Sequence, residues 1–289
     1  MKLKLSQKLL LRYYTAQLKA IALVSPKKAA EKAFALFCTP YSGRTVKTIP
    51  EIFSKAEAIS FRSQDLNIHG FRFRPSESNG KKVLILHGFS SNAYKFDKYI
   101  NPLLKDGFEI VLFDAPGHGR SEGKMINALI YKKVILAAEK KFGPFDGIMG
   151  HSLGGLAGSL AFEELPNHEK RRLALVAPAT ETTTAIDNFF RMVTLDDKTR
   201  QAFMQLITDI GNKDVHYYSV SRVIKQLDSP VLWVHDKQDT ICPYKDVKPL
   251  LKLNLPHVRF MITEQLGHSR IYKDAAVCRE IVGFFKLLH

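Results

Sequence analysis

The strongest constraint on the fold is an alternation of short apolar runs and helical stretches that begins near residue 57. Two runs, AISFRS and NIHGFRFRP, predict an antiparallel pair of strands. Buried strands are predicted at six further runs: 81–88, 109–114, 145–150, 173–178, 230–235 and 258–263. Because helical patterns separate most of these runs, we expect an α/β fold, with a mostly parallel eight-stranded sheet and helices on both faces.

Two segments lie outside this alternation and define the expected domain organisation. Residues 1–56 are predicted to form a basic helical extension, and residues 57–289 the sheet domain. Within that domain, residues 180–229 contain helical patterns such as NFFRMVTLDDKTRQAFMQLITDI where the next strand should follow. We interpret this insertion as a small helical lid, whose large apolar residues Phe189, Phe190 and Met192 are candidates for substrate binding.

The N-terminal extension carries much of the positive charge of the chain. The first 60 residues hold eleven Lys or Arg against three Glu, and so contribute +8 of the net charge of +15. Lys4, Lys8, Arg12 and Lys19 lie on one side of a predicted amphipathic helix, and the last two interrupt its apolar stretch, which excludes a membrane span. We expect this helix to pack on the domain or on a second subunit, as in a homodimer; peripheral contact with an anionic membrane is the alternative.

Composition excludes several other function classes. The three cysteines, Cys38, Cys242 and Cys278, are too few and too widely spaced for a disulfide framework or a CxxC metal pair, which favours a reducing, cytoplasmic location. The positive charge comes without a nucleic-acid-binding motif, so nucleic acid is not an expected partner. No metal or other cofactor is implied.

The strongest chemical signal is the pentapeptide Gly150-His151-Ser152-Leu153-Gly154. It follows a predicted strand and precedes the helical stretch LAGSLAFEEL, which is the context that a nucleophile elbow requires. The glycines leave room for a strained turn that exposes the serine hydroxyl. The Leu153 amide, at the start of the helix, is then placed to bind a developing oxyanion.

A second oxyanion donor is expected from the loop after the first buried parallel strand. His87-Gly88-Phe89-Ser90 follows the run KVLIL at that place, so we expect the backbone amide of Phe89 to be this donor. His87 itself is interpreted as a structural histidine that holds the loop through hydrogen bonds.

A serine nucleophile needs a histidine base, and the histidine needs a carboxylate that fixes its tautomer. His268 lies in a loop directly after the last predicted strand, whereas His257 opens that strand and His289 is the terminal residue. The acid is expected after PVLWVH, where Asp236 and Asp239 compete. Asp239 lies deeper in the loop and is favoured; the alternative is that it only caps the following helix.

Five motifs, in this order, carry a resemblance to a known family: HGFSSN, DAPGHGRS, GHSLGG, HDKQDTICP and GHS. Over residues 57–289 the chain resembles the α/β-hydrolase fold superfamily, nearest its esterase and monoglyceride-lipase-like members. The resemblance implies a catalytic triad and an oxyanion hole made of Ser152, Asp239, His268 and the amides of Phe89 and Leu153. The loop carrying the acid departs from the family pattern, because Asp236 stands where these families usually have glycine.

These residues together indicate a serine hydrolase. A serine at the elbow excludes the alkyl-ester chemistry of haloalkane dehalogenases and soluble epoxide hydrolases, whose nucleophile is a carboxylate. We therefore expect cleavage of a small-molecule carboxylic ester or thioester, with an apolar acyl or aryl group, through an acyl-enzyme on Ser152. An acyltransferase of the same fold and a non-catalytic binding member remain the alternatives.

Overall fold

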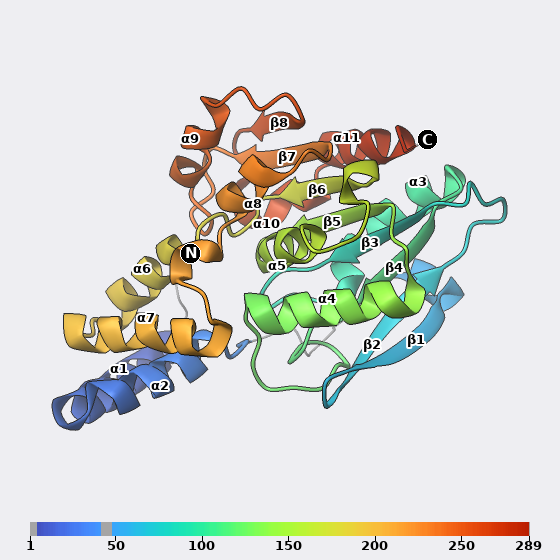
Figure 1. The fold of residues 1–289 in the computed structure, drawn as a ribbon. Coiled ribbons are helices and arrows are strands. Elements are labelled where there is room, and N and C mark those ends of the chain that lie inside the picture. Colours follow the sequence, from blue (N-terminus) through green and yellow to red (C-terminus); the bar gives the residue numbers. More distant parts are fainter. Residues whose placement is uncertain (1–4, 42–47, 289) are drawn as a thin grey trace. The chain divides into compact units, whose positions relative to one another are not determined.

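The computed structural model describes residues 5–41 and 48–288, which fall into two compact units. The sheet unit lies within residues 40–180 and 220–289, and the helical unit within residues 1–39 and 181–219. The helical unit therefore combines the start of the chain with most of the insertion that interrupts the strands (Figure 1).

One eight-stranded sheet organises the sheet unit. Its strands are β1 (Glu57–Ser63), β2 (Leu66–Phe73), β3 (Lys82–Leu86), β4 (Glu109–Phe113), β5 (Gly147–His151), β6 (Arg172–Val176), β7 (Val231–Asp236) and β8 (Val258–Thr263). They are ordered β1-β2-β4-β3-β5-β6-β7-β8. β2 runs antiparallel to β1 and β4, and every other neighbouring pair is parallel. The predicted fold class is thus confirmed.

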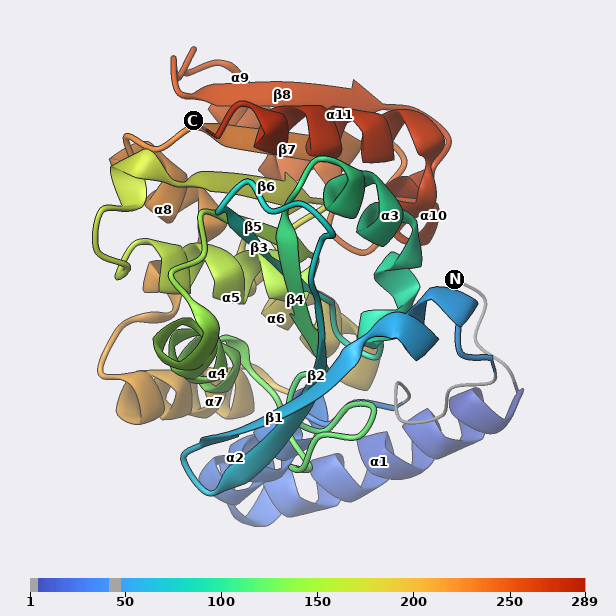
Figure 2. The same cartoon turned by 90° about the vertical axis from the view of Figure 1, so that its right-hand side faces the viewer.

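Helices cover both faces of this sheet. They are α3 (Asp97–Lys105), α4 (Ala128–Phe142), α5 (Leu153–Phe162), α8 (Val220–Gln226), α9 (Lys248–Leu251), α10 (Gly267–Arg270) and α11 (Ala275–Lys286). Helices α3 and α11 lie on one face, and α4, α5 and α8 on the other (Figure 2). Because neither face meets water, β5 is buried at every residue, and β3, β4 and β6 at every residue after the first. This double cover explains why the central strands are continuous apolar runs.

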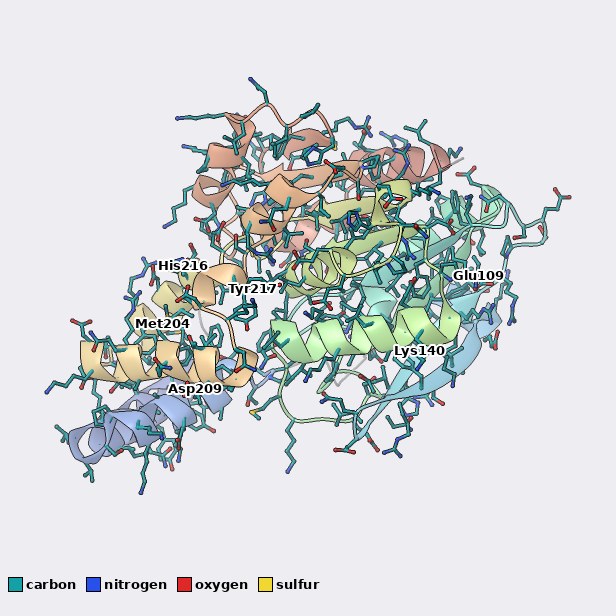
Figure 3. The ribbon with its side chains drawn as sticks, in the orientation of Figure 1. Glu109, Lys140, Met204, Asp209, His216 and Tyr217 are labelled. Carbon is teal, nitrogen blue, oxygen red and sulfur yellow. The ribbon has the colours of Figure 1, made fainter. Side chains whose placement is uncertain are left out.

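The antiparallel edge of the sheet carries an ion pair. Arg72 of β2 donates to Glu109, which begins β4 (Figure 3), with 2.8 Å between Nη2 and Oε2. Both side chains are largely shielded from water, so the pair links the β-hairpin to the parallel part of the sheet.

The helical unit contains α1 (Leu5–Val24), α2 (Pro26–Phe37), α6 (Thr182–Val193) and α7 (Asp197–Gly211). Helix α1 packs on α2 and α6, and α2 packs on α7. Ser25 caps α2, accepting a hydrogen bond from the Lys28 amide, and Pro26 occupies the first turn. Lys4 and the side chain of Lys8 lie outside the described residues.

The core of the helical unit is an aromatic cluster built from both chain segments. Phe203 of α7 is fully buried, and its ring lies 5.6 Å from that of Phe34, 5.7 Å from Phe37 and 5.2 Å from Phe190. Edge-to-face contacts of this kind add to the burial of apolar surface. The first two helices and the insertion therefore stabilise each other.

Among helices within residues 5–41 and 48–288, none is long and apolar enough to cross a membrane.

A histidine ring fixes the loop that follows β3. His87 is buried, its Nε2 accepts a hydrogen bond from the Ala115 amide at 2.9 Å, and its Nδ1 lies 2.8 Å from the Gly88 carbonyl. Since Nε2 accepts, Nδ1 must carry the proton and donate it to Gly88. The neutral ring thus connects the loop after β3 to the loop after β4.

Two side chains of the loop after β4 also accept hydrogen bonds from backbone amides of the loop after β3. His118 Nε2 accepts from the Ser90 amide at 2.9 Å, and the buried Asp114 carboxylate accepts from the Ala93 amide at 3.0 Å. Burial raises the pKa of Asp114, although hydrogen bonds to backbone amides oppose the shift. Three side-chain acceptors therefore hold residues 87–93 in one conformation.

The buried His87 ring predicts a loss of stability in acid. Burial lowers its pKa to about 4, whereas an unfolded histidine titrates near 6.5. Between these pH values the unfolded chain binds a proton that the folded chain excludes, so the free energy of unfolding should fall by about 3 kcal/mol as pH drops from 6.5 to 4.

Chemical denaturation from pH 7.5 to 4 measures this effect. His87→Gln, whose side chain cannot titrate, should show a correspondingly shallower dependence of the free energy of unfolding on pH. If the free energy of unfolding depended equally on pH in the two proteins, His87 would not be the source of the acid sensitivity.

Candidate active site

The turn between β5 and α5 holds Ser152 in a strained backbone conformation. Its φ is 55° and its ψ −122°, and residues other than glycine rarely adopt a positive φ. The surrounding backbone is too close for side chains. A Cβ on Gly150 would lie 2.5 Å from the Gly154 carbonyl oxygen, and one on Gly154 would lie 2.5 Å from the His87 carbonyl oxygen. The glycines of the predicted elbow are therefore required by contact distances.

Three residues distant in sequence form a hydrogen-bonded chain at this turn. Ser152 Oγ lies 3.0 Å from His268 Nε2, and His268 Nδ1 lies 2.8 Å from Asp239 Oδ2. Asp239 can only accept, so Nδ1 donates to it and Nε2 is left to accept from the serine hydroxyl. His268 follows β8 in the short helix α10, and Asp239 follows β7. All three thus project beyond the carboxyl ends of parallel strands.

The two candidate acids, Asp239 and Asp236, have different hydrogen-bond partners in the structure. Asp239 is buried, and its other oxygen, Oδ1, accepts hydrogen bonds from the amides of Ile241 and Cys242 at 2.8 and 2.9 Å. These bonds orient the carboxylate toward His268. Asp239 therefore both reaches His268 and organises its own loop.

Asp236 faces the loop that carries His268 instead. Its Oδ2 accepts from the Thr263 hydroxyl at 2.8 Å and the Leu266 amide at 3.0 Å. Burial acts to raise the pKa of Asp236, but these hydrogen bonds outweigh it and hold the pKa below its usual value. Asp236 thus ties the end of β7 to the segment just before His268.

The two expected oxyanion donors lie beside Ser152. Leu153 begins α5, so its amide has no partner within the helix. Phe89 follows Gly88, which approaches Ser152 so closely that a Cβ on the glycine would fall 2.8 Å from that of Ser152. Among the described residues, neither amide donates a hydrogen bond. The two amides thus belong to the residues that follow Ser152 and Gly88 in the chain, at the place where the two loops meet.

Sequence reasoning missed one residue of this site, His151. The ring is buried, its Nε2 lies 3.0 Å from the His268 carbonyl oxygen, and its centroid lies 4.7 Å from the His268 ring and 4.5 Å from that of Tyr272. Burial, with the nearby His268, lowers its pKa well below the usual value, so the ring is neutral and Nε2 donates to the carbonyl. Its position inside the elbow motif was the only local signal. His151 holds the backbone of His268.

The three predicted substrate-binding residues of the insertion lie in the helical unit. Phe189 and Phe190 are buried in the aromatic cluster there, where the Phe189 ring lies 5.3 Å from that of Phe37. Met192, by contrast, is 43% exposed. Packing between helices therefore accounts for the two phenylalanines without a substrate.

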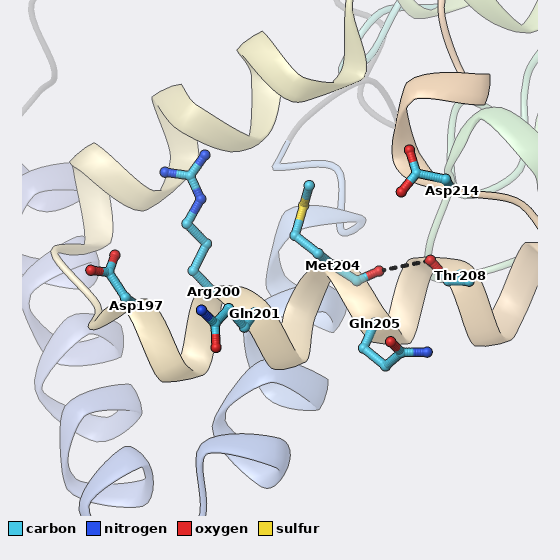
Figure 4. A pocket seen from close by; sticks show the side chains of 7 residues that line it. All are labelled: Asp197, Arg200, Gln201, Met204, Gln205, Thr208 and Asp214. Carbon is cyan, nitrogen blue, oxygen red and sulfur yellow. Dashed lines mark hydrogen bonds between the residues drawn. The ribbon is translucent and has the colours of Figure 1, made fainter.

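The same unit contains an open hollow of about 480 Å³ along α7. Figure 4 shows its lining, which is mostly polar: Asp197, Arg200, Gln201, Met204, Gln205, Thr208 and Asp214. Arg200 forms an ion pair with Asp187 of α6. The Thr208 hydroxyl in this lining donates to the Met204 carbonyl, and no residue of the Ser152 chain lines the hollow, so the arrangement around Ser152 remains the candidate site.

Comparisons with known proteins agree with the fold. A family model described as the α/β-hydrolase fold matches residues 81–207. A serine hydrolase-like protein of Dictyostelium discoideum is 29% identical over 196 residues, which are 64% of this chain and 51% of that protein. The chain thus spans about half the length of the serine hydrolase-like relatives that it matches.

Two further relatives are matched along most of their length. A Mycoplasma pneumoniae protein named as an esterase/lipase is 22% identical over 251 residues, which are 74% of this chain and 92% of that protein. The structure of a Pyrococcus furiosus esterase superposes with a TM-score of 0.63 at 18% identity, covering 86% of this chain and 98% of that one; this likeness concerns the fold. The chain is therefore a protein of the α/β-hydrolase fold, similar to serine hydrolase-like and esterase/lipase proteins.

Proposed function

We propose that the protein is a serine esterase, which hydrolyses carboxylic esters or thioesters through an acyl-enzyme on Ser152. The observation that carries the proposal is the hydrogen-bonded chain from Ser152 through His268 to Asp239, with spacings of 3.0 and 2.8 Å. A serine hydroxyl is a weak nucleophile at neutral pH, and this arrangement is what activates it. The Mycoplasma pneumoniae relative named as an esterase/lipase supports the same reaction class.

Each group has a defined step in the proposed reaction. His268 Nε2 takes the hydroxyl proton as Ser152 Oγ attacks the ester carbonyl. The Phe89 and Leu153 amides bind the resulting oxyanion, and Asp239 stabilises the imidazolium. His268 then gives the proton to the leaving alcohol or thiol. Water, deprotonated by His268, then attacks the acyl-enzyme, and as the C–O bond to Ser152 breaks His268 returns the proton to Oγ, which releases the acid and the free serine.

The surroundings of Ser152 support an apolar acyl or aryl group in the substrate. The Phe89 side chain is half-buried in the oxyanion loop, and its ring lies 6.0 Å from that of Tyr41. Cys242 is buried and its thiol interacts with the Ser152 side chain. Burial raises the pKa of this thiol, which therefore stays neutral.

The triad proposal predicts the kinetics of substitution. Ser152→Ala and His268→Ala should each reduce the turnover of p-nitrophenyl butyrate by about a thousandfold or more, and the double variant should lose little more, because the residues act as a unit. Labelling by a fluorophosphonate should occur in the unmodified protein and in Ser76→Ala, a control at an exposed serine, but not in Ser152→Ala. A protein that is folded, unlabelled and inactive on all esters tested would instead be a non-catalytic member of the fold.

The two aspartates predict different kinds of loss. Asp239→Asn leaves His268 without its acceptor and should reduce kcat by about 10³- to 10⁴-fold. Asp236→Asn should reduce kcat less than tenfold and mainly lower the melting temperature, because Asp236 supports the loop before His268. Steady-state kinetics with thermal unfolding of both variants separates these effects, and the reverse order in kcat would make Asp236 the acid.

The apolar surroundings predict a preference for medium acyl chains. We expect kcat/KM, measured on p-nitrophenyl acetate, butyrate, octanoate and palmitate, to be higher for acyl chains of four to eight carbons than for the two-carbon acetate. Phe89→Ala keeps the backbone amide but removes the ring, so it should flatten this rise while leaving acetate hydrolysis within a few-fold; Leu253→Ala, at an exposed site, is the control. Fastest hydrolysis of acetate by the unmodified protein would refute the preference.

A further inference from the structure

Helix α1 has two apolar faces, and the helical unit uses one of them. Leu18 and Ala22 are 1% and 8% exposed and lie on the side that packs against α2 and α6. Leu11 and Tyr14, on the same side, are partly buried. Packing within the unit therefore accounts for this face completely.

The opposite face is apolar and exposed. At 100° per residue, six residues within 9–24, the part of α1 whose side chains are described, fall within an arc of about 100° centred opposite Leu18. We call this set the outer stripe: Leu9, Tyr13, Ala16, Ala20, Leu23 and Val24. Its large members are strongly exposed, Leu9 at 57%, Tyr13 at 62%, Leu23 at 91% and Val24 at 88%. Such a continuous stripe exceeds the scattered exposure that is normal on protein surfaces.

The charges beside the outer stripe are all positive. Arg12 and Lys19 are exposed and lie along one edge of the stripe. The helix Leu5–Val24 contains no Asp or Glu, and the first acidic residue of the chain is Glu31. A surface complementary to the stripe would therefore be apolar where it meets the leucines and negatively charged where it meets Arg12 and Lys19.

We propose that the outer stripe of α1 lies in the surface of a bilayer that contains anionic lipids. With the helix parallel to the surface, the leucines and valine enter the acyl boundary, the Tyr13 ring lies at the interface, and Arg12 and Lys19 reach the phosphates. From the sequence alone, packing on protein and contact with a membrane are alternatives for this helix. The structure makes them compatible, because the two use opposite faces of α1.

A second copy of the chain fits the outer stripe less well. In a two-fold symmetric pair the same surface meets itself, so the cations of one copy would approach those of the other with no acidic residue of α1 between them. An anionic lipid surface offers both the apolar interior that the stripe can enter and the negative charge that Arg12 and Lys19 can meet. This inference concerns the helical unit alone and does not depend on the proposed esterase activity.

Co-sedimentation of the full chain with vesicles tests the proposal. The vesicles are phosphatidylcholine with 30 mol% phosphatidylserine, compared with phosphatidylcholine alone, each in 50 and 400 mM NaCl. We expect binding to the anionic vesicles in low salt, and at least fivefold weaker binding in high salt or without phosphatidylserine. Absence of binding to anionic vesicles in low salt overturns the proposal.

Matched variants localise the contact. Arg12→Gln/Lys19→Gln should weaken partitioning about 25-fold, at about fivefold per cation, whereas Lys28→Gln/Lys32→Gln, two exposed cations of α2, should change it less than twofold. Leu9→Ser/Leu23→Ser should weaken it at least tenfold, and Leu253→Ser, exposed in the sheet unit, should not. All variants change exposed side chains, so melting temperatures should stay the same.

Two results would contradict the assignment. Equal losses in the two cation pairs would mean that overall charge alone drives binding. Sedimentation velocity that shows a dimer, dissociated by Leu9→Ser/Leu23→Ser, would mean that a second copy covers the stripe.

Discussion

The backbone of Ser152 adopts a φ of 55°, a conformation that costs a residue with a side chain on the order of 1–3 kcal/mol, and the neighbouring structure is arranged to impose it. The residues two before and two after it are glycines because carbonyl groups fill the space of a Cβ. Gly88 brings the loop after β3 against the same turn. The turn that sets the Ser152 conformation thus contains Leu153 and lies against Gly88, whose neighbour Phe89 carries the second amide proposed as an oxyanion donor.

Buried neutral histidines hold these loops together. His87, His151 and His235 each have a pKa lowered by burial, and each places a ring nitrogen 2.8 to 3.0 Å from a backbone carbonyl oxygen, those of Gly88, His268 and Cys242. A neutral imidazole suits this task because it donates from one nitrogen and costs less to bury than a charge. His268, whose side chain keeps 12% exposure, is the ring that contacts the Ser152 hydroxyl.

The helical unit shows how an extension outside the sheet can become part of a fold. Helices α1 and α2 have no strand to pack on within their unit, and they bury their apolar faces against α6 and α7 of the insertion. Phe203 joins the two segments because it contacts rings from both α2 and α6. The insertion and the N-terminal extension therefore form one core, although more than 140 residues separate them in the chain.

The sequence by itself determined the sheet and the elbow, because both leave local signals. Strands buried on both faces must be continuous apolar runs, and a strand, tight turn and helix around Ser152 require glycines at fixed spacing. The position of His268 after the last strand was also readable from chain order.

Asp236 and Asp239 both lie at the end of β7, and only the tertiary structure shows which distant groups their oxygens meet: the Thr263 hydroxyl and Leu266 amide for Asp236, and the His268 ring for Asp239. It also gave His151 its contact with His268, 117 residues away, and gave α1 its partners in the insertion. Local periodicity shows that a face is apolar, but the surface that covers it is fixed by chain topology and by packing between remote segments.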